Sequence, residues 1–244
     1  MSPKAILAVD NLHVRYGRTE VVHGVSFSLT QGAIVGIIGE SGSGKSTIAK
    51  VLMKLHPAAS GSITYPAINP APRLAMIFQD ATGSLNPRRT IGQMLKEVLM
   101  VHSARTPRTQ ALKRVRTISE ILSLVGLSEA VLKQYPRELS GGQCQRISIA
   151  RALATNPDIL IADEPVSALD VSVQARILNL LRDLRRELGL SIIFIAHDLA
   201  VVKNLCDYVH IMEKGIFVES GPSEQVFSTP KAAYTRILLA ACPR

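Results

Sequence analysis

The chain has 244 residues, of which 47% are hydrophobic and 19% are charged, and its formal net charge is +9. This length and composition are enough to bury a core and favour one large domain, or a core with an inserted subdomain. Lysine and arginine are scattered and aromatic residues make up only 4%, which argues against a nucleic-acid-binding protein.

The apolar runs are short, the longest being residues 33–38, 158–162 and 191–196. All are far below the roughly 18 residues that cross a bilayer, so no membrane-spanning segment is predicted. The apolar run within the N-terminal residues 1–11 is also too short for a signal peptide. Three widely spaced cysteines favour a reducing compartment over a disulfide framework or a metal site: Cys144, Cys206 and Cys242.

The first third of the chain predicts mainly strands. Residues 6–17 and 21–32 are typical of two β segments with a turn between them. Residues 32–39 are rich in β-branched side chains and end at glycine, which predicts a buried strand. A helix is expected over 45–55, whereas the prolines of residues 56–80 favour loops and edge strands.

The rest of the chain predicts a block of helices and then alternating strands and helices. Residues 91–133 have a helical apolar period, carried by Leu112, Val115, Ile118, Ile121, Leu122 and Val125. Strands are expected over 158–163 and 191–197, with helices over 173–188 and near 198–206. This alternation implies an α/β fold with a mostly parallel sheet, and the helical block at about 80–149 is predicted to be an inserted subdomain.

Residues 39–47, GESGSGKST, are referred to below as the phosphate loop. They fit G-x-x-x-x-G-K-[ST] and stand between a predicted strand and a predicted helix, as this nucleotide-binding motif requires. Glycines let backbone N–H groups wrap phosphates, Lys45 would reach the β and γ oxygens, and the Ser46 hydroxyl would bind Mg²⁺. The residues predicted to contact ATP here are Gly39, Ser41, Gly42, Gly44, Lys45, Ser46 and Thr47.

A second motif, ILIADEP, ends a predicted buried strand with two carboxylates. Ligand sites of open α/β sheets lie at the carboxyl ends of the strands. Asp163 is therefore predicted to hold the Mg²⁺ shell, and Glu164 to orient an attacking water.

The third motif, LSGGQ at residues 139–143, is referred to as the signature segment. It precedes a predicted helix whose N-terminal dipole points at the glycines. In this order, the three motifs resemble those of the ATP-binding subunits of ABC transporters. The resemblance covers about residues 5–243. It implies one ATPase domain of the P-loop NTPase type, with a core and antiparallel β subdomain formed by about 1–79 and 150–244 and a helical subdomain of about 80–149.

The resemblance also implies roles for further residues. Two such subunits would pack head to tail, so that Ser140, Gly141, Gly142 and Gln143 of one cap the ATP of the other. Tyr16 would stack on adenine, Gln79 would sense Mg²⁺ and water, and Asp170 would touch the opposite site. His197 would contact the γ-phosphate, making Glu164, His197, Lys45 and Gln79 the catalytic set and Ser46, Gln79 and Asp163 the metal set.

Two stretches, 79–90 and 228–243, resemble the importers of peptides and nickel within this family. That branch implies transmembrane permease subunits, a second ATPase subunit and, indirectly, a solute-binding protein as partners, and a peripheral place on the cytoplasmic face of the inner membrane. A heterodimer of ATPases is favoured over a homodimer. Only Cys242 lies near the end of the chain, so no iron–sulfur cluster is predicted. The short interval 61–79 leaves the outer β-strands in doubt and favours nickel or metal-chelate importers.

Alternative functions stay open at this point. An exporter ATPase is the nearest alternative, and the two branch-specific stretches argue against it. An ABC-type ATPase acting on DNA or the ribosome would carry coiled coils, zinc modules or a second ATPase unit, which this sequence lacks. A regulatory module without turnover conflicts with the presence of Glu164 and His197.

Overall fold

The computed structural model describes residues 4–66, 71–105 and 116–241. Its centre is a six-stranded sheet in which the first five strands of the spatial order are parallel and the sixth is antiparallel. In spatial order the strands are β5 (Leu74–Ile77), β6 (Ile159–Asp163), β7 (Ser191–Ala196), β3 (Ile34–Ile38), β8 (Tyr208–Glu213) and β9 (Ile216–Pro222). This arrangement confirms the predicted α/β class with a mostly parallel sheet.

The two faces of this sheet are covered by different elements. In β3, Val35 and Ile37 pack in the hydrophobic core on one face of the sheet, and Ile34 and Ile38 pack in the core on the other face. The first face meets helix α1 (Lys45–Leu52) and a separate antiparallel sheet. The second face packs against helices that include α5 (Val171–Leu188). Because both faces are buried, the central strands β6, β7 and β3 are apolar except at their ends, where Asp163 and Ser191 stand.

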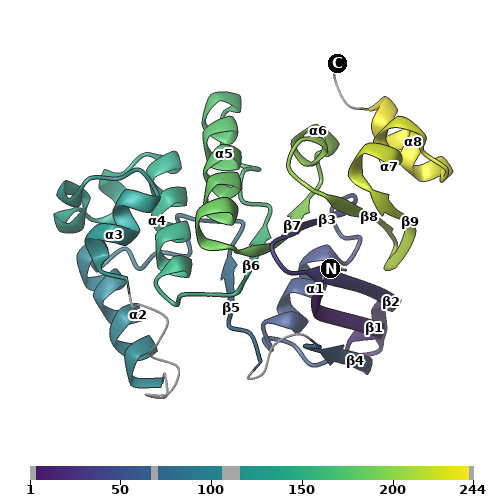
Figure 1. Cartoon of the computed structure of the whole chain (residues 1–244), viewed down its shortest axis with the longest axis horizontal. Helices are drawn as coiled ribbons and strands as arrows, with labels where there is room; N and C mark the ends of the chain where they lie inside the picture. Colours follow the sequence, from purple (N-terminus) through teal and green to yellow (C-terminus); the bar gives the residue numbers. More distant parts are fainter. Residues whose placement is uncertain (1–3, 67–70, 106–115, 242–244) are drawn as a thin grey trace.

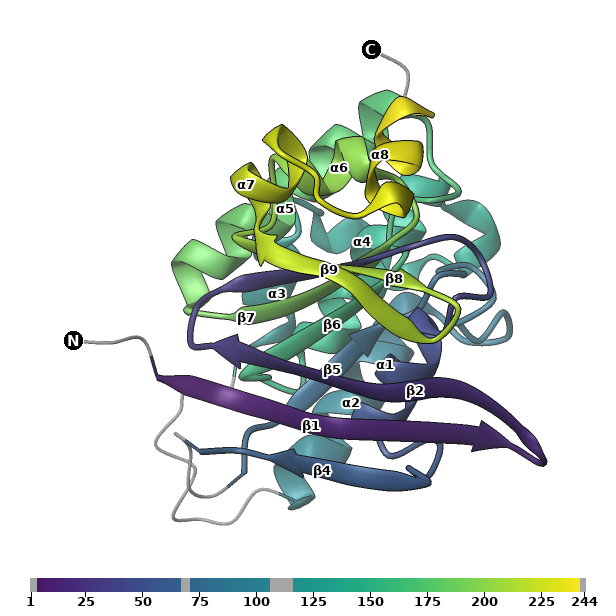
Figure 2. The ribbon, with the colours of Figure 1, turned by 90° about the vertical axis from the view of Figure 1, so that its right-hand side faces the viewer.

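The separate sheet has three antiparallel strands in the order β2, β1, β4. Strands β1 (Ala5–Tyr16) and β2 (Thr19–Thr30) match the two β segments predicted at the start of the chain. Strand β4 (Ser60–Thr64) pairs with β1, so the short interval keeps an outer strand despite its prolines. Figure 2 shows this sheet as a layer beside the larger one.

The helical block forms one end of the molecule in Figure 1. It contains α2 (Ile91–Arg105), α3 (Ile118–Leu124) and α4 (Gly141–Leu153). Two 3₁₀ turns, Glu129–Lys133 and Pro136–Glu138, lead into α4. The helical prediction for 91–133 is confirmed for 91–105 and 118–124 and, as a 3₁₀ turn, for 129–133, whereas residues 125–128 form a connection that is not helical. Leu112 and Val115 lie outside the described residues.

Five described elements follow β7. Helix α6 (Leu199–Lys203) was predicted, whereas the hairpin β8–β9 was not assigned from the sequence. Helices α7 (Ser223–Ser228) and α8 (Ala233–Ala240) follow and lie together at the end of the molecule opposite α2 and α3 (Figure 1). Among the residues that the structure describes, no helix is both long enough and apolar enough to span a bilayer.

Candidate active site

The phosphate loop joins β3 to α1 at the carboxyl edge of the parallel strands. Gly44 adopts a left-handed conformation with φ 108° just before α1, and no side chain caps this helix. The first N–H groups of α1 are thus without a side-chain acceptor, as is typical of helix starts that bind anions. Gly39 leaves no room for a side chain, because a Cβ there would stand 2.1 Å from the Met212 carbonyl oxygen. Buried residues of the loop are Gly39, Ser43, Gly44, Lys45 and Thr47, and exposed ones are Glu40, Ser41 and Gly42.

Lys45 lies in the cradle of this loop and is 3% exposed. Its Nζ donates hydrogen bonds to the carbonyl oxygens of Gly39 at 2.8 Å and Glu40 at 2.7 Å. Burial lowers the pKa of Lys45, while the nearby acids, Glu164 foremost, oppose that shift. The carboxylates thus partly offset the cost of burying this ammonium group.

Ser46 and Asp163 form the predicted metal-binding pair. The Ser46 hydroxyl donates to Asp163 Oδ1 at 2.8 Å, and Asp163 ends strand β6 with 6% exposure. Burial raises the pKa of this carboxyl group. Hydroxyl and carboxylate oxygens suit Mg²⁺, which usually takes its other ligands from phosphates and water. The described residues hold no cluster of three or more His, Cys, Asp or Glu able to bind a metal.

Glu164 is the centre of the predicted catalytic set. Its Oε2 accepts a hydrogen bond from Gln79 Nε2 at 2.8 Å and lies 3.2 Å from His197 Nδ1, and its Oε1 lies 4.0 Å from Lys45 Nζ. The structure therefore brings together four residues that are far apart in the sequence. Gln79 bonds here to Glu164 and not to the Ser46–Asp163 pair, with which the sequence analysis also grouped it.

The backbone at Glu164 is also unusual. It has φ 45°, a left-handed conformation that non-glycine residues adopt rarely and that often marks functional sites. The Glu164 N–H donates to the Ile195 carbonyl oxygen of β7, which holds this conformation. The side chain, 12% exposed, borders a cavity of about 530 Å³ whose wall includes Gln79, Gly141 and His197. This space is large enough for a water and phosphate oxygens beside the carboxylate.

The signature segment starts helix α4 with a capping box. Ser140 Oγ accepts from the Gln143 N–H at 3.3 Å, and Gln143 Oε1 accepts from the Ser140 N–H at 2.9 Å. Ser140 and Gly141 are exposed, so the positive end of the α4 dipole faces outward. Gly142 is tightly placed, since a Cβ there would stand 2.8 Å from Val173 of α5.

Two other residues, Asp170 and Tyr16, were predicted to contact a partner site and adenine, and each contacts residues of its own chain in the structure. Asp170 caps α5, where its Oδ1 accepts from the Val173 N–H at 3.0 Å and from the Ser172 hydroxyl at 2.8 Å. Tyr16 ends β1, is 42% exposed, and stacks on His56 with ring centroids 4.2 Å apart. Their contacts to a partner site and to adenine stay predictions.

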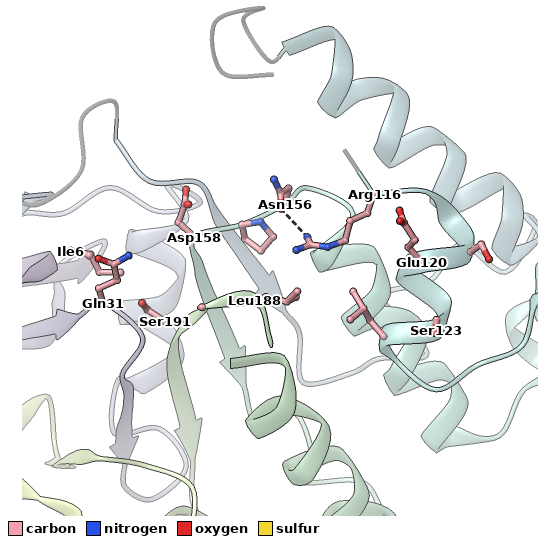
Figure 3. Close-up of a pocket in the computed structure, with 13 residues that line it drawn as sticks. Ile6, Gln31, Arg116, Glu120, Ser123, Asn156, Asp158, Leu188 and Ser191 are labelled. Carbon is pink, nitrogen blue, oxygen red and sulfur yellow. Dashed lines mark hydrogen bonds between the residues drawn. The ribbon is translucent and has the colours of Figure 1, made fainter. Parts of the chain in front are cut away.

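A larger groove lies away from this chemistry. Its volume is about 850 Å³, and Figure 3 shows it between α3 and the starts of β6 and β7. Asp158 and Ser191 stand at the amino ends of these strands, whereas Asp163 and Glu164 stand at the carboxyl end of β6. The side chains of Arg116 and Asn156 bond across its wall at 2.8 Å. The groove therefore belongs to the edge of the sheet opposite the phosphate loop.

The sequence analysis missed one residue beside the loop. Tyr234 of α8 places its hydroxyl 3.2 Å from the Glu40 backbone nitrogen. The stretch 228–243 had been used only to place the chain within a branch of the family. No local pattern of this stretch shows which distant backbone group Tyr234 contacts.

Several known proteins resemble this chain in sequence. The oligopeptide transport ATP-binding protein OppF of Escherichia coli is 46% identical over 235 residues, which cover 92% of this chain and 70% of that protein. OppF of Bacillus subtilis is 41% identical over 239 residues, covering 93% and 77%. A putative peptide import ATP-binding protein of Brucella abortus is 42% identical over 258 aligned positions, covering 100% and 80%.

Solved structures agree in fold. CbiO1 of Clostridium perfringens, part of the ABC transporter complex cbiONQ, superposes with a TM-score of 0.77 at 27% identity and covers 92% of this chain and 91% of that one. The ADP conformation of MJ1267, an ATP-binding cassette of an ABC transporter, gives 0.77 at 26% identity, covering 96% and 99%. The model of the ABC transporter family matches residues 22–167. The phosphate loop, the acids Asp163 and Glu164, and the signature segment all lie inside that match. The chain therefore belongs to the ABC transporter family, as one of its ATPases.

Proposed function

We propose that this ATPase energises an importer of peptides by hydrolysing ATP at the site around Glu164. The observation that carries the proposal is the contact of one carboxylate with Gln79 and His197 beside Lys45. The relatives named above are peptide-transport ATP-binding proteins at 41–46% identity, which favours peptides over nickel or metal chelates as the cargo.

The chemistry is in-line attack of water on the γ-phosphate, which needs positioning and charge stabilisation. Glu164 orients the water, and its bonds to Gln79 and His197 fix the carboxylate. Lys45 exchanges the carbonyl oxygens it now contacts for phosphate oxygens, and His197 faces the γ-phosphate. Mg²⁺ held by Ser46 and Asp163 would neutralise charge on the phosphates.

The proposed unit of activity is a head-to-tail pair of ATPase subunits. Ser140 and Gly142 of one subunit cap the γ-phosphate held by the other, and Asp170 lies across the same interface. The exposed start of α4 supports this arrangement, because its dipole attracts an anion brought from outside. MJ0796, a structural neighbour with a TM-score of 0.71 and 27% identity, has been solved as a dimer bound to ADP and Pi. Pairing with a different ATPase is preferred over pairing with a second copy.

The remaining partners follow from the importer assignment. Transmembrane permease subunits would carry the peptide, and the ATPase would sit peripherally on the cytoplasmic face of the membrane. A solute-binding protein would act on it only indirectly, through the permease. An exporter ATPase is the alternative, and import is supported by the names of the relatives.

The test compares ATP hydrolysis and ATP-dependent dimerisation of wild type and Glu164→Gln. We expect hydrolysis to fall about 10²- to 10⁴-fold, the range of general-base effects, with ATP binding retained. Light scattering follows the dimer, and Glu187→Gln, a change at an exposed glutamate of α5, serves as the matched control. Full activity in Glu164→Gln would refute the catalytic assignment.

The dimer measurement separates the two modes of pairing. If Glu164→Gln dimerises with ATP, one kind of chain builds both composite sites. If wild type is inactive and the mutant stays monomeric, a second ATPase or the permease is required. Co-expression with candidate permease subunits and peptide-stimulated hydrolysis in vesicles then test the importer itself.

A further inference from the structure

The C-terminal helix α8 contacts the phosphate loop directly. The backbone N–H of Glu40 donates a hydrogen bond to the Tyr234 hydroxyl at 3.2 Å, across 194 positions of sequence. Glu40 also accepts from Lys45 Nζ through its carbonyl oxygen at 2.7 Å. One loop residue is therefore held at its nitrogen by α8 and at its oxygen by the lysine that meets the phosphates.

The start of α8 is fixed to the core rather than hanging from it. The Glu219 carboxylate of β9 accepts from the backbone N–H groups of Lys231 at 2.8 Å and Ala232 at 3.0 Å. Thr235 is fully buried, and the Tyr234 ring packs against the core of the helical face. Burial also raises the pKa of Tyr234, so its hydroxyl stays protonated. Such a tyrosine has little freedom to move away from Glu40.

Other ties reach the loop through backbone groups of the sheet. Gly215 of the β8–β9 turn donates to the Ser43 carbonyl oxygen at 3.0 Å, and the Gly39 N–H donates to the Ala196 carbonyl oxygen at 3.4 Å. The bonds from Lys45, by contrast, must weaken when that ammonium turns to phosphate oxygens. Hydrogen bonds that do not involve Lys45 would hold the loop conformation while Lys45 moves from the carbonyl oxygens to the phosphate oxygens. A preorganised site requires such a fixed conformation.

We propose that Tyr234 is a positioning residue for ATP, which holds the phosphate loop in its binding conformation through the Glu40 N–H. The proposal deepens the function given above and rests on it, since it concerns the same nucleotide. It also assigns a role to the tyrosine of stretch 228–243. The hydroxyl, rather than the ring, carries this role.

The test is Tyr234→Phe in the full chain, which removes the hydroxyl and keeps the ring. The matched control is Tyr208→Phe in β8, whose ring lies against His210. Four quantities are measured: the Kd of a fluorescent ATP analogue, KM and kcat for ATP, the melting temperature, and hydrogen exchange of the amides of residues 39–44. The binding and exchange measurements need no turnover.

Loss of one neutral hydrogen bond predicts a rise of about two- to tenfold in Kd and KM, with kcat unchanged. Exchange at the Glu40 amide should quicken without nucleotide, while Tyr208→Phe behaves as wild type. Unchanged Kd and exchange in Tyr234→Phe would overturn the proposal. So would a lower melting temperature with unchanged KM, which indicates a merely structural tyrosine. Failure of the wild type itself to bind ATP would instead refute the proposed function.

Discussion

The phosphate loop and the signature segment are two glycine-rich stretches that each open a helix, yet they are built in opposite ways. Helix α1 begins at a left-handed Gly44 without a side-chain cap, whereas α4 begins with a reciprocal capping box between Ser140 and Gln143. The first loop is shaped by distant contacts, such as those of Met212 and Tyr234. The second is shaped by its own side chains and faces outward.

This difference bears on what each stretch can bind. A loop shaped by the core can bind phosphates within a single subunit, because its donors are already in place. A locally capped, exposed helix start has no enclosing wall of its own, so we expect it to complete a site only when another surface brings the anion. In the proposed dimer, the phosphate loop would thus be the container for the phosphates of one subunit, and the signature segment would be the lid over those of its partner.

The sharpest test of this contrast exchanges one glycine for alanine in each stretch. In Gly39→Ala the new Cβ would stand 2.1 Å from the Met212 carbonyl oxygen, whereas in Gly141→Ala it would meet Leu169 at an ordinary 3.6 Å. Overpacking of about 3 kcal/mol predicts a melting temperature about 6 to 12 °C lower for Gly39→Ala. We expect its ATP binding to be lost as well, as measured by calorimetry.

Gly141→Ala is the internal control, with an unchanged melting temperature and unchanged ATP binding by the isolated subunit. Its hydrolysis should still fall, because the cap is altered in the dimer. Equal damage to ATP binding from both substitutions would contradict the division into container and lid.

Acid should weaken the sheet behind the phosphate loop. Burial lowers the pKa of His210 in β8 to about 4, among Phe27, Tyr208 and Phe217 and with Ser220 Oγ 2.7 Å from its Nδ1. Between pH 6.5 and 4, His210 is protonated in the unfolded chain but neutral in the folded protein. The free energy of unfolding is therefore unaffected by this group above pH 6.5, and it falls as the pH is lowered towards 4.

The expected loss is about 3 kcal/mol, at about 1.4 kcal/mol for each unit of pKa difference. Urea unfolding at several pH values measures it. His210→Gln should flatten the dependence, and His23→Gln at an exposed site should not. A wild-type unfolding free energy that stays constant from pH 6.5 to 4 would rule out this role for His210.

A smaller change in stability and ATPase rate would separate the helix-capping role of Ser140 from its proposed role in ATP hydrolysis. Ser140 and Thr117 both cap a helix through a capping box, in α4 and α3 respectively. Replacing either by alanine should cost about 1 kcal/mol of stability, measured by denaturant unfolding. Only Ser140→Ala should also lower hydrolysis, by about tenfold, as expected for one lost charge-assisted hydrogen bond. Matching ATPase rates for the two variants would remove Ser140 from the composite site.

The smallest expected effect concerns the base of the nucleotide. If Tyr16 stacks on adenine, Tyr16→Ala should raise the Kd for ATP of the isolated subunit about two- to tenfold, the value of one aromatic stack. Tyr16→Phe should bind as wild type does. Because the subunit alone is measured, Ser140→Ala should leave this Kd unchanged. A Kd unaffected by Tyr16→Ala would mean that the base is held elsewhere.

Much of this protein followed from its sequence alone. Apolar strands, helical periods and glycine spacing are local patterns, so the α/β class, strands β1 to β3 and the phosphate loop could be predicted. Asp163 and Glu164 could be placed beside that loop because parallel strands share one carboxyl edge. The signature segment was also recognisable, since its five consecutive residues resemble the signature of the family.

Only the tertiary structure decided which distant groups meet. The hairpin β8–β9 and helix α8 carry weak local signals, yet Met212, Gly215 and Tyr234 from this part shape the phosphate loop. The left-handed backbone of Glu164 depends on a bond to strand β7. Such contacts join residues up to 194 positions apart, and their geometry is set by the packing of the whole sheet rather than by any neighbouring sequence.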